Sequence, residues 1–103
     1  MDKIKALSDI LASNPDDSFA RYGLAMAHAA EDRPTEALEE YNETIRRAPD
    51  YVPAYQMSAQ LLLQMGQHDQ ARDRLQQGLE AAHRTGNAHA ASEMQAMVDD
   101  LPS

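Results

Sequence analysis

The residues of this chain that could hold a metal ion or move a proton are its histidines and carboxylates, since it contains no cysteine. A metal site needs several such ligands that converge on one point, and on a helix two ligands converge when they lie about one turn apart. No two histidines have that spacing, and Gly86 separates the last two. The four are His28, His68, His83 and His89. The sequence therefore predicts no metal site and no cofactor.

A run of glutamates in the middle of the chain is the other candidate for chemistry, because paired carboxylates can act as general acid and base. These glutamates fall near the solvent side of a predicted helix, where a carboxylate keeps its ordinary pKa. They are Glu36, Glu39, Glu40 and Glu43. We expect a solvated face here. The sequence also shows no glycine-rich phosphate loop and no nucleophile motif around its serines, so it predicts a protein that is not an enzyme.

The charge balance argues against nucleic acid as a partner. The chain carries 17 acidic and 9 basic residues, a formal net charge of −8, and both halves are acidic. Such a surface repels phosphate backbones. Asp2 and Asp9 interrupt the N-terminal segment, so it does not resemble a secretory signal with an apolar core. No apolar run approaches the roughly 20 residues that span a bilayer. We therefore expect no membrane contact and a cytoplasmic location, which the absence of cysteine also fits.

Apolar residues recur at helical spacing in six segments, and proline or glycine separates most of them. Pro15 and Pro49 end helices, Pro34 begins one, and Gly66 and Gly86 follow helices as C-terminal stops. The expected helices cover residues 2–13, 18–30, 34–47, 52–65, 69–84 and 87–100. Their connections are short, which places neighbouring helices antiparallel.

The helical pattern repeats with a period of 34 residues. Ala25 recurs as Ala59, and Ala37 recurs as Ala71. A fixed period of this length is typical of stacked supersecondary units that cannot bury their apolar faces alone. Alanine at a helix crossing lets two backbones approach to roughly 8–9 Å, so the recurring alanines are expected at the crossings.

This pattern resembles the tetratricopeptide repeat. The first full unit has Leu24, Ala25, Ala37, Tyr41 and Pro49 at the motif positions, and the second has Tyr55, Ala59, Gly66, Ala71 and Leu75. The resemblance implies one all-α domain over residues 1–103, an α-solenoid of antiparallel hairpins coiled into a right-handed superhelix. It divides into a half repeat (1–17), two repeats (18–51 and 52–85) and a capping helix (86–101).

Three residues depart from the family pattern. Arg21 stands where the first helix usually has an aromatic residue, Asp32 replaces the usual turn glycine, and Ser58 replaces a leucine. We expect these residues to weaken individual packing layers without changing the architecture.

The resemblance also implies a concave groove, lined by the first helix of each unit, that receives a peptide or helix from another protein. Projected onto this chain, the groove is uncharged and rich in methionine, tyrosine and glutamine, which favours a partner with apolar anchors. The expected lining residues are Phe19, Tyr22, Met26, Ala29, Ala30, Gln56, Gln60, Leu63, Gln64, Ala90, Met94 and Met97.

Two other interpretations of this face remain open. Met94 and Met97 could fold over the groove as part of the core, or the groove or end helices could form a homodimer interface. Some family members clamp a terminal carboxylate of chaperone tails with lysine and asparagine. Tyr22, Met26 and Met57 occupy the matching positions here, so we expect no binding of such tails.

Overall fold

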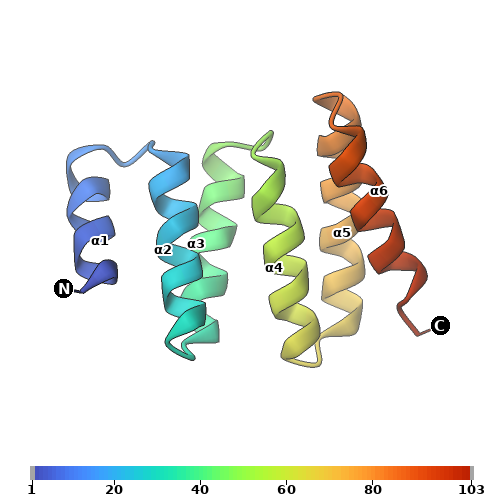
Figure 1. The fold of residues 1–103 in the computed structure, drawn as a ribbon, viewed down its shortest axis with the longest axis horizontal. Coiled ribbons are helices and arrows are strands. Elements are labelled where there is room, and N and C mark those ends of the chain that lie inside the picture. The colour runs from blue at the N-terminus through green and yellow to red at the C-terminus, as the bar shows by residue number, and fades with distance from the viewer. Residues whose placement is uncertain (1, 103) are drawn as a thin grey trace.

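The chain folds into a row of six α-helices in the computed structural model, which describes residues 2–102 (Figure 1). No strand occurs in that range, and the expected all-α solenoid of helical hairpins is confirmed. The helices are α1 (Lys3–Ser13), α2 (Ser18–Ala30), α3 (Pro34–Arg47), α4 (Val52–Gln64), α5 (His68–Arg84) and α6 (Ala88–Asp99). The predicted bounds of α2 and α3 are correct, those of α1, α4 and α5 differ by one residue at one end, and α6 is one residue shorter at each end than predicted.

Side chains just before three of the helices explain where these helices begin. Asp2, Asp17 and Asn87 each accept a hydrogen bond from a backbone N–H in the following first turn. Each such cap contributes roughly 1 kcal/mol, because it satisfies a donor that has no partner inside the helix. Pro34 and Pro53 lie in the first turns of α3 and α4, where no backbone donor is needed.

The turns after α2 and α4 share one geometry, and each uses a residue with positive φ. Asp32 has a φ of 59° and Gly66 a φ of 77°, and the two lie 34 residues apart. The following residue closes each turn, since Arg33 N donates to His28 O and Gln67 N donates to Leu62 O. Asp32 therefore adopts the conformation of the glycine that it replaces.

The core runs along the whole stack as three clusters that lie between successive helices. The alanines expected at the helix crossings, Ala25, Ala37, Ala59 and Ala71, are completely buried. Contacts join each helix mainly to its neighbours in the row. The stability of such a structure is the sum of local interfaces, which makes its two ends distinct surfaces.

Ion pairs connect successive repeats at the loops after α1 and α3. Asp16 and Asp50 hold the same position in successive units, 34 residues apart. Arg47 Nη1 donates to Asp16 Oδ1 over 2.8 Å, and Arg84 Nε donates to Asp50 Oδ1 over 2.7 Å. These pairs were not predicted, because each joins a loop to the end of a helix more than 30 residues away.

Candidate functional site

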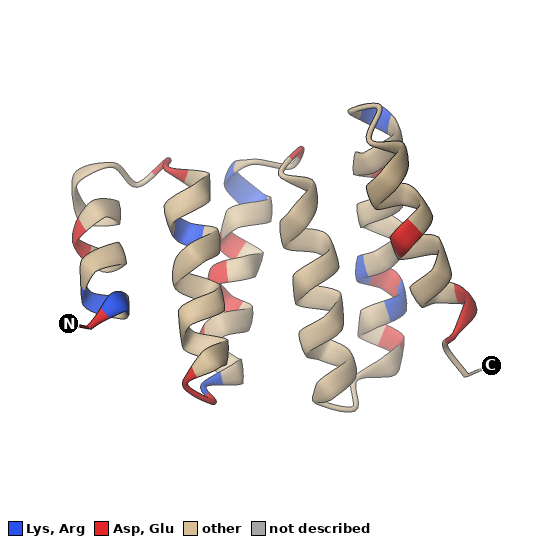
Figure 2. Cartoon of the chain, in the orientation of Figure 1, with Lys and Arg blue, Asp and Glu red and all other residues tan. Residues whose placement is uncertain are grey.

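The residues of α2, α4 and α6 that are expected to line the groove carry no charge, and the charged residues of these three helices are Arg21, Glu93 and Asp99. In Figure 2 the charged residues gather mainly on α3 and α5, whereas α4 carries none. Charged side chains there would keep their hydration shells, and a face without them is easier to strip of water on contact with a partner. This face holds two hollows.

The first hollow, here called the central hollow, lies between α2 and α4 and has a volume of about 260 Å³. Tyr41 of α3 and Leu61 of α4 are buried core residues that contribute to its lining. Gln60 and Gln64 are exposed at its edge, where each carboxamide can donate and accept hydrogen bonds. The full lining is Ala29, Ala30, Tyr41, Met57, Gln60, Leu61 and Gln64.

The second hollow, here called the N-terminal hollow, lies between α1 and α2 and has a volume of about 400 Å³. Its lining is mainly apolar, and the side chains of Phe19 and Met26 are exposed beside it. The lining residues are Lys3, Leu7, Ile10, Asp17, Phe19, Ala20, Tyr22, Gly23 and Met26.

Residues that the sequence predicts for one groove line both of these hollows. Ala29, Gln60 and Gln64 line the central hollow, whereas Phe19, Tyr22 and Met26 line the N-terminal hollow. Gln56 and Leu63 of α4 are half-buried and line neither of the two.

Aromatic contacts hold the ring of Tyr22 at the N-terminal hollow. The ring centroid lies 6.0 Å from that of Tyr41 and 5.4 Å from that of Tyr51, both in tilted arrangements. Burial raises the pKa of Tyr22, and burial with the nearby Tyr22 raises the pKa of Tyr41 to about 12. Both phenols are therefore neutral at physiological pH, and Tyr22 serves the core as well as the surface.

The prediction that Met94 lines the groove is wrong. Its side chain is completely buried, and it belongs to the core cluster formed by α4, α5 and α6. Gly78 of α5 makes room for it, since a side chain there would collide with the Met94 sulfur. Ala90 is buried and Met97 packs half-buried against the same cluster, so the interpretation in which the last helix completes the core is confirmed.

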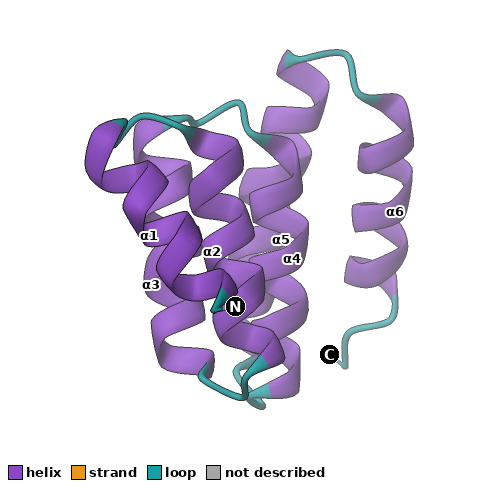
Figure 3. Cartoon of the chain, turned by 60° about the vertical axis from the view of Figure 1, so that its left-hand side comes forward, coloured by secondary structure: helices purple, strands orange, loops and turns teal. Residues whose placement is uncertain are grey.

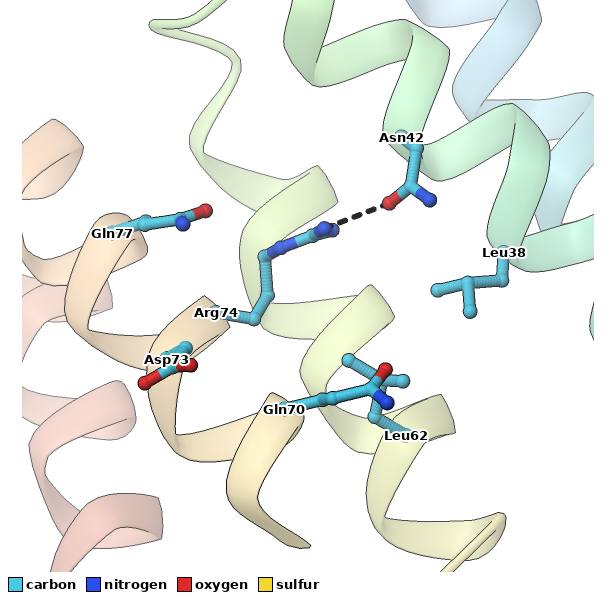
Figure 4. Close-up of a pocket in the computed structure, with 7 residues that line it drawn as sticks. All are labelled: Leu38, Asn42, Leu62, Gln70, Asp73, Arg74 and Gln77. Carbon is cyan, nitrogen blue, oxygen red and sulfur yellow. Dashed lines mark hydrogen bonds between the residues drawn. The ribbon is translucent and has the colours of Figure 1, made fainter. Parts of the chain in front are cut away.

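A third hollow, of about 210 Å³, lies on the side of the second helices and is polar (Figure 4). Arg74 of α5 extends across it, and its guanidinium donates to Ser58 Oγ over 2.8 Å and to Asn42 Oδ1 over 2.7 Å. Burial lowers the pKa of Arg74. Ser58 is fully buried, and its hydroxyl also donates to Tyr55 O. The sequence hint of this polar contact was a serine where the family pattern has leucine.

The acidic run of α3 is not simply solvated, which corrects the prediction. Glu40 accepts a hydrogen bond of 2.8 Å from Arg21, with only 26% of the Glu40 side chain exposed. Hydrogen bonds from Arg46 and Arg47 lower the pKa of Glu43 to about 2. These carboxylates are acceptors in ion pairs, and an ion-paired carboxylate with so low a pKa is a poor proton donor or acceptor near neutral pH.

Among residues 2–102, no group of three or more histidine or acidic side chains is arranged to hold a metal ion. No helix in the described part of the chain is long and apolar enough to cross a membrane.

Comparison with known proteins gives consistent matches. A family model described as "Tetratricopeptide repeat" matches residues 4–57 and 28–94. The solution structure of a tetratricopeptide repeat domain protein from Salinibacter ruber is 34% identical, covers 82% of this chain and 86% of that chain, and has a TM-score of 0.78. No curated protein matches.

Two structures with bound partners share the fold at lower identity. The complex of the TPR2B domain of yeast Sti1 with pHsp70 is 22% identical, with coverages of 92% of this chain and 76% of that chain and a TM-score of 0.86. The type III secretion chaperone SycD of Yersinia enterocolitica, in complex with a peptide of the translocator YopD, is 18% identical, with coverages of 93% and 74% and a TM-score of 0.84.

Proposed function

This chain belongs to the tetratricopeptide repeat family, and on that premise we propose that it is a non-enzymatic scaffold that binds a peptide or helix of another protein. Within the domain we propose the division expected from the sequence, with a half repeat at 1–17, repeats at 18–51 and 52–85, and a capping helix at 86–101. The fold neighbours that carry pHsp70 or a YopD peptide support a protein partner in general.

We place the binding site in the central hollow. The observation that carries this assignment is an uncharged hollow with apolar walls and exposed carboxamides at one edge. An apolar side chain of a peptide can enter such a space, while Gln60 and Gln64 hydrogen-bond its backbone. The net charge of −8 favours the approach of a peptide with basic flanking residues to the protein as a whole.

The partner is not expected to be held by a terminal carboxylate. Tyr22, Met26 and Met57 carry no positive charge, so none of these side chains can form an ion pair with a carboxylate. The proposed recognition therefore depends on apolar anchors along the peptide.

Selection from a displayed peptide library tests this proposal, followed by fluorescence-polarisation measurement of Kd for the selected peptides. We expect selected peptides to lose at least about tenfold in affinity against Gln60→Ala/Gln64→Ala, since truncating a central contact costs more than about 1 kcal/mol. Ala29→Arg, which fills the hollow from an exposed position, should abolish binding.

The matched control is Gln76→Ala/Gln77→Ala, which removes two exposed carboxamides from α5 on the opposite side. Selected peptides that bind the Ala29→Arg protein as tightly as the wild type would refute the central hollow as the site. A selection that yields no binding peptide would refute peptide binding itself.

A further inference from the structure

The N-terminal end of the stack exposes an apolar surface that the chain itself does not cover. Phe19, Ile10 and Met26, exposed at 75%, 46% and 41%, all line the N-terminal hollow. Among the described residues, the one other exposed large hydrophobic residue is Met65, which lies in the turn after α4. An apolar patch gathered around a hollow is typical of an interaction site.

The internal repeat shows what kind of element covers such a surface. Leu7 of α1 holds the position that Tyr41 holds in α3, 34 residues later. Tyr41 is only 1% exposed, because Tyr22 and Ala25 of the antiparallel helix α2 pack in the same cluster. Leu7 remains half-buried, since α1 has no such helix on that side (Figure 3). The surface thus fits an antiparallel helix.

We propose that a second copy of this chain covers the N-terminal hollow, in a two-fold symmetric dimer with the two α1 helices antiparallel. A two-fold axis perpendicular to a helix makes that helix antiparallel to its own copy, as the internal repeat requires. The same patch holds a projecting side chain, Phe19, and the hollow that can receive it. A patch of this kind is self-complementary, which is the condition for a closed interface.

The charges beside the hollow complement each other in this arrangement. Its charged lining residues are Lys3, at the first position of α1, and Asp17, just beyond the opposite end of α1. In an antiparallel pair, Lys3 of one copy lies near Asp17 of the other. Lys3 also approaches the C-terminal end of the second α1, where a positive charge is favoured by the helix dipole.

The other end of the stack is built differently, which favours a closed dimer over an open filament. Glu93 of α6 holds the position of Ala25 and Ala59 in the two preceding first helices, and it is exposed. A charged side chain at a helix crossing prevents the close approach that alanine allows. The α6 end is therefore a polar cap, and head-to-tail stacking of α1 on α6 is disfavoured.

Sedimentation equilibrium of the full chain tests the proposal over about 1 µM to about 1 mM, the range in which a modest interface dissociates. The wild type should pass from the 11.4 kDa monomer to a dimer. Ile10→Asp and Phe19→Asp should each raise the dissociation constant at least about tenfold while circular dichroism shows unchanged helix content. Lys3→Glu should weaken the dimer, and the effect should shrink with added salt.

Two variants serve as controls and should dimerise like the wild type. Met65→Asp places the same charge on the exposed methionine outside the patch, and Ala29→Arg blocks the central hollow. Because Ala29→Arg should abolish peptide binding and leave the dimer intact, this proposal and the proposed function fail independently. A wild type that stays monomeric, a dimer that both aspartate variants retain, or a mass that grows beyond the dimer would each overturn the inference.

Discussion

Met94 of α6 lies against Gly78 of α5 so closely that a Cβ on Gly78 would stand 2.5 Å from the Met94 Sδ atom and 2.7 Å from Tyr55 Cβ. The first neighbour can move, because methionine is flexible, but Tyr55 Cβ is fixed to the backbone of α4. We expect Gly78→Ala to lower the free energy of unfolding by about 1–2 kcal/mol, because the clash exceeds the gain of about 1 kcal/mol in helix propensity. Urea denaturation measures this change.

Gly23 is the matched control for this substitution, since it also lies inside a helix. A Cβ at Gly23 would meet Leu7 at 3.6 Å, an ordinary contact. Gly23→Ala should therefore raise the free energy of unfolding by about 0.5–1 kcal/mol. If both substitutions were stabilising, the packing of α6 on α5 would be looser than described.

The turn after α2 is strained by its side chain. Asp32 has a φ of 59°, a conformation that costs an L-residue about 1 kcal/mol and glycine almost nothing. We expect Asp32→Gly to raise the free energy of unfolding by up to about 1 kcal/mol, less the extra freedom of glycine in the unfolded chain. Gly66→Ala, at the equivalent turn, should lower it by about 1 kcal/mol. Thermal or urea unfolding that ranks the two variants in the reverse order would contradict this account.

Ser58 and Arg74 should be energetically coupled, because the hydroxyl accepts a hydrogen bond from a half-buried guanidinium. Ser58→Ala alone removes one acceptor of a charged donor and should cost about 1–3 kcal/mol. Once Arg74→Met has removed the donor, the same substitution should cost much less. A double-mutant cycle in urea should therefore give a coupling energy above about 0.5 kcal/mol, and an additive cycle would show that the bond contributes nothing.

The free energy of unfolding should depend on the ionisation of Glu43. Its pKa falls from 4.5 to about 2 in the folded chain, because Arg46 and Arg47 hydrogen-bond its carboxylate. A lowered pKa means that this stabilisation is fully present above pH 4.5 and is lost as the pH falls toward 2. Glu43→Gln should flatten the stability profile in this acid range, whereas Glu39→Gln, an exposed neighbour on α3, should leave it unchanged. NMR titration of the Glu43 carboxyl should show a midpoint near pH 2.

Much of the fold could be predicted because its signals are local. The ends of α2 and α3 were predicted to the residue, since Asp17 and Pro34 act on the first turn beside them. The crossings of the helices were also predictable, because alanines that recur with one period must occupy equivalent contacts. Their complete burial confirms this.

The candidate site was predicted less well, because it depends on how helices rotate against one another. Met94 could face the groove or the core from its sequence position, and the space beside Gly78 decided for the core. Tyr22 could lie free in the groove from its sequence position, but its ring packs against Tyr41 and Tyr51.

By itself, then, the sequence determined the helices, their order and the residues at which they cross, since turn chemistry and a 34-residue period act over short distances. Only the tertiary structure decided which polar residues meet and which surfaces stay open. Ser58 and Arg74 are joined across 16 residues, and the hollow beside Phe19 exists because α1 has a helix on one side alone. Such relationships arise from the packing of whole helices, for which no single segment carries a signal.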